Sequence, residues 1–286
     1  MANLKEIRNR IASVKSTMQI TSAMKMVSAA KLKKAQDAIT AMRPYANKLT
    51  ELLQNLSGSL DGDVGAKYTD NRAVNKVLLV SITSNRGLCG AFNSNIIKES
   101  VSLYNEKYQG KQVDYLTIGK KGNDILGKKY TVIANESAVF DNLTFENVAA
   151  IAEDLMNKFT EGAYDRIELV YNRFKNAATQ IVTTEQFLPI VPMESDANAG
   201  ADYIFEPSKP EIVEQLIPKS LKTQLYKAIR DSFASEHGAR MTAMHKATDN
   251  AGELKDQLTL TYNKARQAAI TGEILEIVGG AEALND

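Results

Sequence analysis

The sequence predicts an α/β protein with two parts. Long N- and C-terminal helices form an antiparallel coiled coil, and a central Rossmann-like α/β domain is built on a mostly parallel sheet. Alternating spacings of three and four join apolar and small residues over 4–56, and again over 233–275, as in helices that pack on a partner helix. Between these repeats, short apolar runs alternate with helical patterns, which is typical of a parallel sheet covered on both faces.

The first helix is predicted over residues 4–56, which corresponds to about 80 Å of helix. Pro44 is expected to kink or split this helix, because proline lacks the N–H that a helix interior requires. The seam expected to face a partner helix consists of Leu4, Ile7, Ile11, Val14, Met18, Thr21, Lys25, Ser28, Leu32, Ala35, Ile39, Met42, Ala46, Leu49, Leu53 and Leu56.

The middle of this seam is polar. Thr21, Lys25 and Ser28 occupy seam positions there. Met24, Met26 and Val27 lie off the seam. An isolated helix pair would favour the reverse distribution, so we expect the outward apolar side chains to contact something other than the partner helix. Methionine suits surfaces that repack against several geometries.

The central domain is predicted over residues 76–208, after a linker at 57–75 that is rich in Gly, Asp and Asn. The apolar run at 76–83 is typical of a buried parallel strand. Strands are expected at 76–83, 113–118, 130–134, 166–172 and 179–187, and helices at 92–108 and 145–159.

A second long helical segment is predicted over residues 209–286, after a loop-like stretch at 189–210. Small residues dominate its seam, so the two terminal helices could approach closely. Because both helices leave the same central domain, an antiparallel pair is the simplest arrangement. The expected seam consists of Phe233, His237, Arg240, Met244, Ala247, Ala251, Leu254, Leu258, Thr261, Ala265, Ala268, Gly272 and Leu275.

The composition excludes several classes of protein. The 286 residues include one cysteine, Cys89, which excludes an internal disulfide and fits a reducing compartment. Together with two histidines it leaves little material for a zinc site. The N-terminal stretch lacks the apolar core of a signal peptide, and no apolar run approaches the length of a membrane span. We therefore expect a soluble protein.

The net charge of +1 is unevenly distributed. Residues 1–56 carry ten Lys or Arg against three Asp or Glu. Such a basic helix suggests an acidic partner, either protein or nucleic acid, although it is equally consistent with a solvated, lysine-rich face. Tyr45 is the only aromatic residue in this segment, so base stacking is poorly supplied.

One glycine-containing turn could hold a phosphate. Residues 84–93, SNRGLCGAFN, lie between a predicted strand and a predicted helix, where nucleotide-binding folds bind phosphate. The segment matches neither GxGxxG nor a Walker loop, so an ordinary glycine turn is the favoured interpretation. Cys89 lies near Arg86, but no histidine is nearby in sequence, and a small, partly buried thiol is expected.

The other titratable residues form no catalytic pattern. His237 and His245 lie eight residues apart, about 80° apart around a helix, and no carboxylate accompanies both at metal-ligand spacing. Solvated or seam-packed histidines are expected. The acids of 121–165 are scattered, without the pairing that acid–base catalysis uses. We expect no catalytic residues, no metal and no cofactor.

Three separated segments resemble the γ-subunit family of bacterial F-type ATP synthases. They are KEIRNRIASVKSTMQITSAMKMVSAAKL, SNRGLCGAFN and NKARQAAITGEILEIVGGAEAL, and the resemblance covers the whole length. It implies a rotor shaft that transmits torque and catalyses nothing alone. The terminal helices would turn inside a ring of three α and three β subunits, and the globular part would sit on the membrane c-ring and the ε subunit.

The resemblance also implies a peripheral position on the cytoplasmic face of the bacterial plasma membrane, without membrane insertion and without nucleic-acid binding. The regulatory cysteine pair of chloroplast relatives has no counterpart in this sequence, and we expect no mitochondrial presequence. Both points favour the bacterial type.

Particular residues acquire roles from the resemblance. Met24 and Lys25 lie in the segment that meets acidic loops of the β subunits, and Arg240 is coupled to that segment. Arg266 and Gln267 match residues that hydrogen-bond to a β-subunit loop. The expected β-subunit contacts are Met24, Lys25, Arg240, Arg266, Gln267, Thr271 and Glu273, and the expected c-ring contacts are Tyr203 and Glu206.

Without the resemblance, each of these residues has an ordinary interpretation: Met24 as a packing residue, Lys25 as a solvated cation and Arg266 as part of a surface ion pair. Two other functions also stay open on the residues alone. One is a nucleotide-binding α/β enzyme that uses the turn at Gly87–Gly90, and the other is a basic coiled-coil adaptor for nucleic acid.

Overall fold

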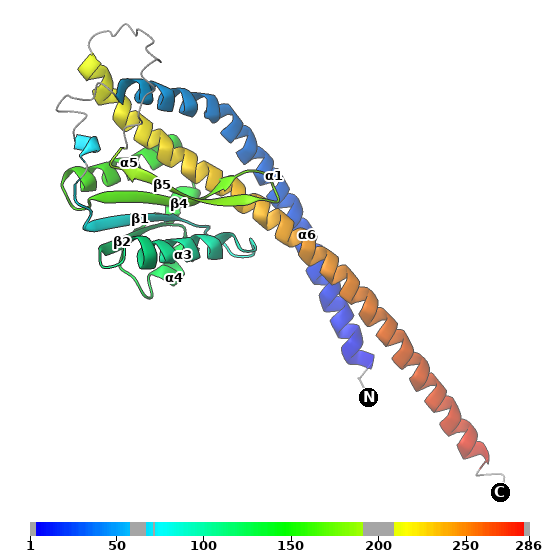
Figure 1. Ribbon diagram of the computed structural model, residues 1–286. Coiled ribbons are helices and arrows are strands. Elements are labelled where there is room, and N and C mark those ends of the chain that lie inside the picture. The colour runs from blue at the N-terminus through cyan, green and yellow to red at the C-terminus, as the bar shows by residue number, and fades with distance from the viewer. Residues whose placement is uncertain (1–3, 58–66, 71, 191–208, 283–286) are drawn as a thin grey trace. The chain divides into compact units, whose positions relative to one another are not determined.

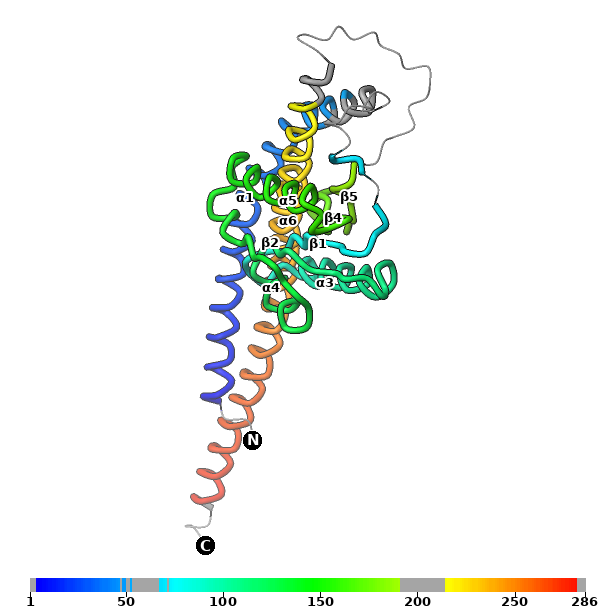
Figure 2. The backbone as a smooth tube through the Cα atoms, turned by 90° about the vertical axis from the view of Figure 1, so that its left-hand side faces the viewer, coloured from blue at the N-terminus to red at the C-terminus, as the bar shows by residue number. Residues whose placement is uncertain are grey.

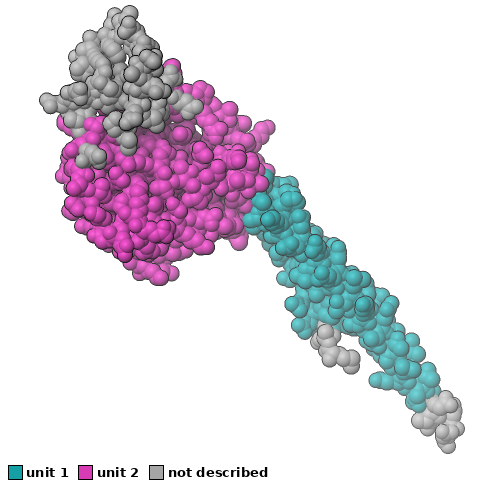
Figure 3. Space-filling view, in the orientation of Figure 1, with its two compact units in different colours: residues 1–28, 241–286 teal, residues 29–240 magenta. Residues whose placement is uncertain are grey.

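A computed structural model of the protein describes residues 4–57, 67–70, 72–190 and 209–282. The chain divides into two compact units, with residues 1–28 and 241–286 in unit 1 and residues 29–240 in unit 2 (Figure 3). The elements used below are, in chain order, α1 (Leu4–Ser57), β1 (Lys76–Ile82), α3 (Phe92–Ser102), the π-helix η1 (Leu103–Lys107), β2 (Gln112–Ile118), α4 (Lys120–Leu126), β3 (Val132–Asn135), the 3₁₀-helix η2 (Ser137–Phe140), α5 (Phe145–Thr160), β4 (Arg166–Phe174), β5 (Gln180–Leu188) and α6 (Lys209–Glu282).

In unit 1, the first part of α1 and the last part of α6 lie side by side in both views (Figure 1, Figure 2). Arg8 Nη2 donates a hydrogen bond to Tyr262 Oη at 2.9 Å. Farther along α1, the hydroxyl oxygens of Thr21 and Thr248 are 2.8 Å apart. Residue numbers therefore rise along one helix as they fall along the other. The predicted antiparallel coiled coil is confirmed.

The predicted seam of α1 is the least exposed side of that helix. Ile7 and Leu32 are buried, and the polar Thr21 and Ser28 at seam positions are buried as well. The buried hydroxyls are satisfied locally, since Ser28 Oγ donates to the backbone oxygen of Met24 at 2.8 Å. The polar seam is therefore compatible with close helix packing.

The seam of α6 has a different phase from the predicted one. Leu254 and Thr261 were expected to face α1, but both are exposed, and the adjacent Lys255 and Tyr262 are half-buried instead. Polar contacts of Thr248 and Tyr262 with α1 hold this phase. Apolar spacing alone favoured the more hydrophobic leucine, and the prediction for these two positions is wrong.

The proline in α1 does not split the helix. Helix α1 continues through Pro44, and its second half curves (Figure 1), as long helices do at an internal proline. The residues on either side of Pro44 reach α6 within unit 2. Arg43 Nη2 lies 3.8 Å from a carboxylate oxygen of Asp231, and Lys219 Nζ lies 5.9 Å from the ring centre of Tyr45.

The sheet of unit 2 has the strand order β3-β2-β1-β4-β5. Strands β1 to β4 pair in parallel, and β5 is antiparallel to β4. In β1 and β2 every side chain after the first is buried, as the continuous apolar runs predict for strands covered on both faces. The fold class predicted from the sequence is confirmed.

Alternate side chains of β1 supply two hydrophobic cores, one on each face of the sheet. Leu78, Val80 and Ile82 pack in the core that α5 and α6 cover. Val77 and Leu79 pack in the core on the other face, beneath α3 and α4. The sheet is therefore sandwiched between helices (Figure 1).

Two short helices of the structure have no counterpart among the predicted elements. Helix α4 and helix η2 were not predicted, because segments of seven and four residues are too short to show helical periodicity. The helix expected over 92–108 changes at Leu103 into the π-helix η1, so only its first part is α-helical.

Within unit 2, α6 is held closely against the sheet. Ser235 Oγ donates to the backbone oxygen of Asn172 at 2.9 Å. The side chain of Asn172 in turn donates to the backbone oxygen of Phe92, at the start of α3, at 3.1 Å. A Cβ added at Gly238 would lie 3.1 Å from the backbone oxygen of Ala177 in the β4–β5 turn. Glycine thus allows α6 to approach this turn.

Candidate functional site

Lys25 is oriented by α6 in unit 1. Its Nζ lies 3.3 Å from Nδ1 of His245, and that same nitrogen lies 3.3 Å from a carboxylate oxygen of Asp249. Met24 and Lys25 are both half-buried. The contact with His245 restricts the lysine side chain, so its charge lies at a defined place on the helix pair.

Near Lys25, the side of α1 that faces away from its seam is apolar and open. Ile20, Met26 and Val27 are 59%, 65% and 57% exposed. Surface apolar residues are normally scattered singly, so three of them within eight residues mark a surface suited to a partner. The off-seam position predicted for Met26 and Val27 agrees with their exposure.

The last turns of α6 have no helix beside them in unit 1. From Arg266 to Ala281 every side chain is exposed, apart from the half-buried Gly272. Arg266 and Gln267 form no hydrogen bond or ion pair within the described part of the chain, and Thr271 and Glu273 lie on the same open segment. The large apolar side chains exposed there are Ile270, Ile274, Leu275, Ile277 and Val278.

Arg240 is buried in unit 2, unlike the other described residues with expected partner contacts. Its side chain is only 9% exposed, and its Nη1 is 2.6 Å from Oε1 of Glu236, one turn earlier. Its Nη2 donates to the backbone oxygens of Arg86 and Gly87 at 3.2 and 3.3 Å. The guanidinium therefore links α6 to the turn at residues 84–93, and its donors point into the same unit.

The turn that Arg240 holds is strained and closed by side chains. Leu88 has φ 61°, a left-handed conformation that a bulky residue rarely adopts, and it is 66% exposed. Ser84 N donates to Oδ1 of Asn93 at 2.9 Å, and Asn93 Nδ2 donates to Ser84 Oγ at 2.8 Å. Cys89 is buried, and burial raises the pKa of its thiol.

This geometry differs from a phosphate cradle, which directs backbone N–H groups at its ligand. The carbonyl oxygens of Arg86 and Gly87 point at Arg240, and Phe92 N–H donates to the backbone oxygen of Cys89 at 3.3 Å. The structure favours the interpretation of residues 84–93 as a structural turn. The sequence marked the segment by its two glycines but gave no signal for its partner on α6.

Two further buried ionisable groups lie on α6 in unit 2. His237 packs edge-on against Phe233 with ring centres 4.5 Å apart, and neither ring nitrogen has a hydrogen-bond partner among the described residues. Burial, together with nearby Arg240, lowers its pKa to about 4, so it is neutral at physiological pH. Asp231 has a pKa raised to about 6, chiefly by burial. Both positions are packing sites of the helix.

Tyr203 and Glu206, the expected c-ring contacts, lie outside the described residues. Within the described ranges, no group of three or more His, Cys, Asp or Glu side chains could hold a metal ion. No helix in that same part of the chain is long and apolar enough to cross a membrane.

Comparisons with known proteins agree on one family. A family model described as ATP synthase matches residues 3–284. A protein of Flavobacterium johnsoniae named ATP synthase gamma chain is 76% identical over 286 residues, covering 100% of both chains. A chain of the Tetrahymena thermophila mitochondrial ATP synthase central stalk and c-ring structure is 27% identical, with a TM-score of 0.61, covering 80% of this chain and 99% of that one. A Euglena gracilis mitochondrial ATP synthase chain, at 24% identity, shares the fold, with a TM-score of 0.71 and coverage of 98% and 94%.

Proposed function

Because this chain belongs to the family of ATP synthase gamma chains, the non-catalytic rotor subunits of the central stalk, we propose that it transmits torque between a proton-driven membrane c-ring and a hexamer of three α and three β subunits. The observation that carries this proposal is the open end of α6. Its exposed apolar and polar side chains extend beyond the part of unit 1 where α1 and α6 pair. A helix end of this composition requires a surrounding partner.

Rotation of the shaft changes the nucleotide sites because its contacts differ in strength between the conformational states of the β subunits. A ligand or partner shifts a conformational equilibrium only by as much as its affinity differs between the states. An asymmetric helix pair meets each β subunit differently at each rotational angle, so it favours a different state of each nucleotide site. The isolated chain needs no catalytic residues for this role.

Arg266 and Gln267 are the proposed grip on one β subunit at a time, and Thr271 and Glu273 extend the contact along the same segment. Both grip residues are exposed and unpaired in the described chain, so their donors are free for a partner. Hydrogen bonds to a charged group are about twice as strong as neutral ones, and the arginine fork adds direction.

Met24 and Lys25 form the second proposed contact, with acidic loops of the β subunits. The orientation of Lys25 by His245 supports a defined contact, and the apolar side chains around it support a surface that repacks as the shaft turns. The contribution of one exposed ion pair is about 0.5–1 kcal/mol, so this contact adjusts coupling more than assembly.

Arg240 is proposed to affect the β subunits indirectly, without contacting them. Since its guanidinium binds Glu236 and the backbone oxygens of the 84–93 turn, we place it as a positioning residue. It fixes the turn that exposes Leu88, and it influences β-subunit contacts through that turn.

The remaining contacts complete the proposed rotor. Tyr203 and Glu206 are assigned to the foot on the c-ring, and the ε subunit to a position beside the globular part. The complex lies at the cytoplasmic face of the bacterial plasma membrane, where this chain is a peripheral component without membrane insertion. The proposed shaft consists of residues 1–56 and 209–286. A linker at 57–75 connects it to the globular domain, which consists of residues 76–208.

The test compares reconstituted complexes that carry Arg266→Ala or Gln267→Ala with complexes that carry Lys264→Ala. Lys264 is also exposed, and two residues place it on the opposite side of the helix from Arg266, so it is the control for Arg266→Ala. We expect the first two variants to lower steady-state multi-site ATP hydrolysis and ATP synthesis by about tenfold, which corresponds to about 1.4 kcal/mol of lost contact. Slow single-site hydrolysis should survive in both.

The Lys264→Ala complex should keep normal steady-state and single-turnover rates. Wild-type rates in both alanine variants, or an equal loss in Lys264→Ala, would remove the proposed grip.

A further inference from the structure

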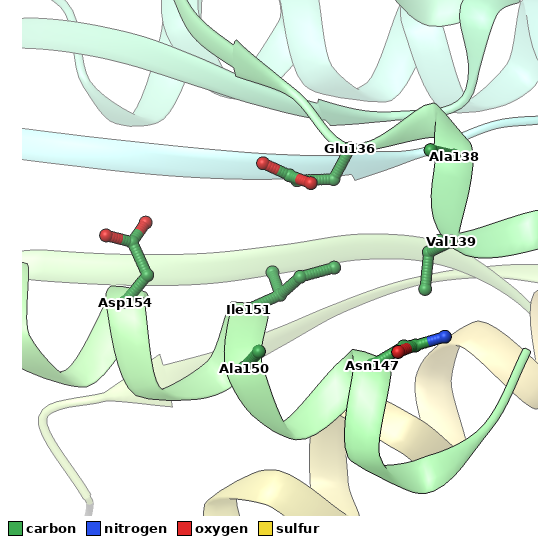
Figure 4. Close-up of a pocket in the computed structure, with 7 residues that line it drawn as sticks. All are labelled: Glu136, Ala138, Val139, Asn147, Ala150, Ile151 and Asp154. Carbon is green, nitrogen blue, oxygen red and sulfur yellow. The ribbon is translucent and has the colours of Figure 1, made fainter.

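A cavity of about 380 Å³ opens on unit 2 between η2 and α5, away from every residue discussed above. Figure 4 shows its wall on the α5 side, formed by Asn147, Ile151 and Asp154 at helical spacing. Glu136 and Val139 line the opposite side, and the carboxylates of Glu136 and Asp154 face each other across the opening. Its volume is that of a small ligand site.

The rim that carries Glu136 is rigid. Its backbone N–H donates to the oxygen of Thr117 in β2 at 2.8 Å, and its backbone oxygen accepts from Val139 N at 3.3 Å. The next residue is also held, because Asn85 Nδ2 donates to the backbone oxygen of Ser137 at 3.0 Å. The cavity is thus fixed to the sheet and does not depend on a loose loop.

The carboxylate of Glu136 has no polar partner among the described residues. It occupies the N-cap position of η2, but its side chain makes no capping hydrogen bond, and within the described residues it forms no ion pair. Asp154 accepts from Lys158, one turn later on α5. Asp154 is therefore already paired, and the uncompensated negative charge of the cavity is that of Glu136, since no Lys, Arg or His lines it.

The floor between the two acids is apolar. Val139 and Ile151 are buried members of the core beneath α5. Asn147 Nδ2 donates to the backbone oxygen of Asn142 at 2.8 Å, and its Oδ1 accepts no hydrogen bond from the described residues. An occupant must therefore combine an apolar stem with a cationic head that has several donors. Arginine has this combination, and its planar fork binds carboxylates in two directions at once.

We propose that this cavity receives an arginine side chain from a neighbouring polypeptide. The guanidinium lies between Glu136 and Asp154, and the methylene stem lies on Ile151. The identification of the neighbour as another subunit of the assembled enzyme rests on the proposed function, whereas the recognition chemistry belongs to the cavity alone.

The first experiment measures recognition in the full, isolated chain by NMR of its Ala138, Ala150 and Ile151 methyl groups. The probe is N-acetyl-arginine methylamide, and the matched control is N-acetyl-citrulline methylamide, which has the same shape without the charge. We expect saturable shifts with the arginine probe and about tenfold weaker binding of the citrulline probe.

Variants then locate the binding. Glu136→Gln and Asp154→Asn should each weaken the arginine probe about fivefold, whereas Glu146→Gln, an exposed acid on the first turn of α5 outside the cavity, should leave its affinity unchanged. Equal affinity for both probes, or no loss in Glu136→Gln and Asp154→Asn, overturns the proposed chemistry.

The second experiment tests the neighbour. A cysteine at Ala150, on the cavity wall, should react with a maleimide at least about tenfold more slowly in the assembled enzyme than in the free chain. Glu146→Cys on the same helix should react equally in both. Unchanged reactivity of the Ala150→Cys variant overturns the assignment of a subunit neighbour. The proposed torque function is untouched by that result, because it depends on the α6 grip.

Discussion

Asp231 is a buried carboxylate whose charge should destabilise unit 2 at neutral pH. Its side chain is 3% exposed, the facing Arg43 Nη2 is 3.8 Å away, and Oδ1 has no hydrogen-bond partner among the described residues. Burial raises its pKa to about 6. Arg43, Lys227 and Arg173 oppose this shift, and Glu185 adds to it.

The direction in which the free energy of unfolding changes with pH follows from the number of protons that each state binds. Because the pKa in the folded chain lies above the unfolded value of 3.8, the folded state binds more protons than the unfolded state between about pH 4 and pH 6. The free energy of unfolding therefore falls as pH rises through this window, and the full cost is present above it. A shift of about two units corresponds to about 3 kcal/mol.

The perturbation is Asp231→Asn, which removes the charge and keeps the shape. We expect the free energy of unfolding at pH 8 to rise by about 1–2 kcal/mol. This is less than the full cost, because the amide loses the attraction of Arg43 and must itself find hydrogen bonds. Near pH 3.5, where the wild-type carboxyl is mostly protonated, the two proteins should be equally stable.

The assay is amide hydrogen exchange in β4, β5 and the adjoining part of α6, measured at pH values from 3.5 to 8 with correction for intrinsic exchange. In a companion cycle, Arg43→Gln should destabilise the wild type at pH 8 by about 1 kcal/mol, and have no effect in the Asp231→Asn background. An Asp231→Asn protein that is no more stable at pH 8, with the same pH slope as the wild type, would refute the reasoning.

Two smaller predictions concern the carboxyl end of β1. Gly119 has φ 119°, and an added Cβ would lie 2.3 Å from the backbone oxygen of Thr83, so Gly119→Ala should lower the unfolding free energy by about 3 kcal/mol or more. Gly87→Ala meets nothing within 4 Å and should change it by less than about 0.5 kcal/mol in urea titrations. Because burial raises the pKa of the Cys89 thiol, iodoacetamide at pH 8 should alkylate the folded chain at least about tenfold more slowly than the urea-unfolded chain, and equal rates would contradict the buried position.

Features of the fold that impose a periodic pattern on the sequence were predicted. The three-four spacing located the seam of α1 because burial of one helix face imposes that period, and even the polar Thr21 and Ser28 follow it. The same reasoning misplaced Leu254, because two heptad phases share half of their positions. The choice between them depended on hydrogen bonds to Thr248 and Tyr262, which spacing does not report.

The candidate site was predictable to a similar extent. Arg240 was expected on the seam of α6 that faces α1, but its guanidinium bonds to the backbone of Arg86 and Gly87. These contacts join segments more than 150 residues apart, and no local pattern encodes them. The exposure of Arg266 depends on where the pairing of α1 and α6 ends, which is a property of register. The cavity beside Glu136 was missed because Glu136 lies at the N-cap of η2 and Asp154 lies on α5, and no periodicity joins acids on two different elements.

The antiparallel pairing of the chain ends also has a consequence for synthesis on the ribosome. Thr21 finds its partner hydroxyl 227 residues later in the chain. At about 5–20 residues per second, roughly 10–45 s separate the emergence of the two threonines. During that interval the seam of the first helix has no partner on its own chain.

Isolated helices without tertiary packing are marginal in water. This segment therefore forms a helix only part of the time, and its isoleucines and methionines are accessible to chaperones. The polar residues in mid-seam lower the apolar content of this unpaired segment, which reduces its tendency to aggregate before the last helix is synthesised.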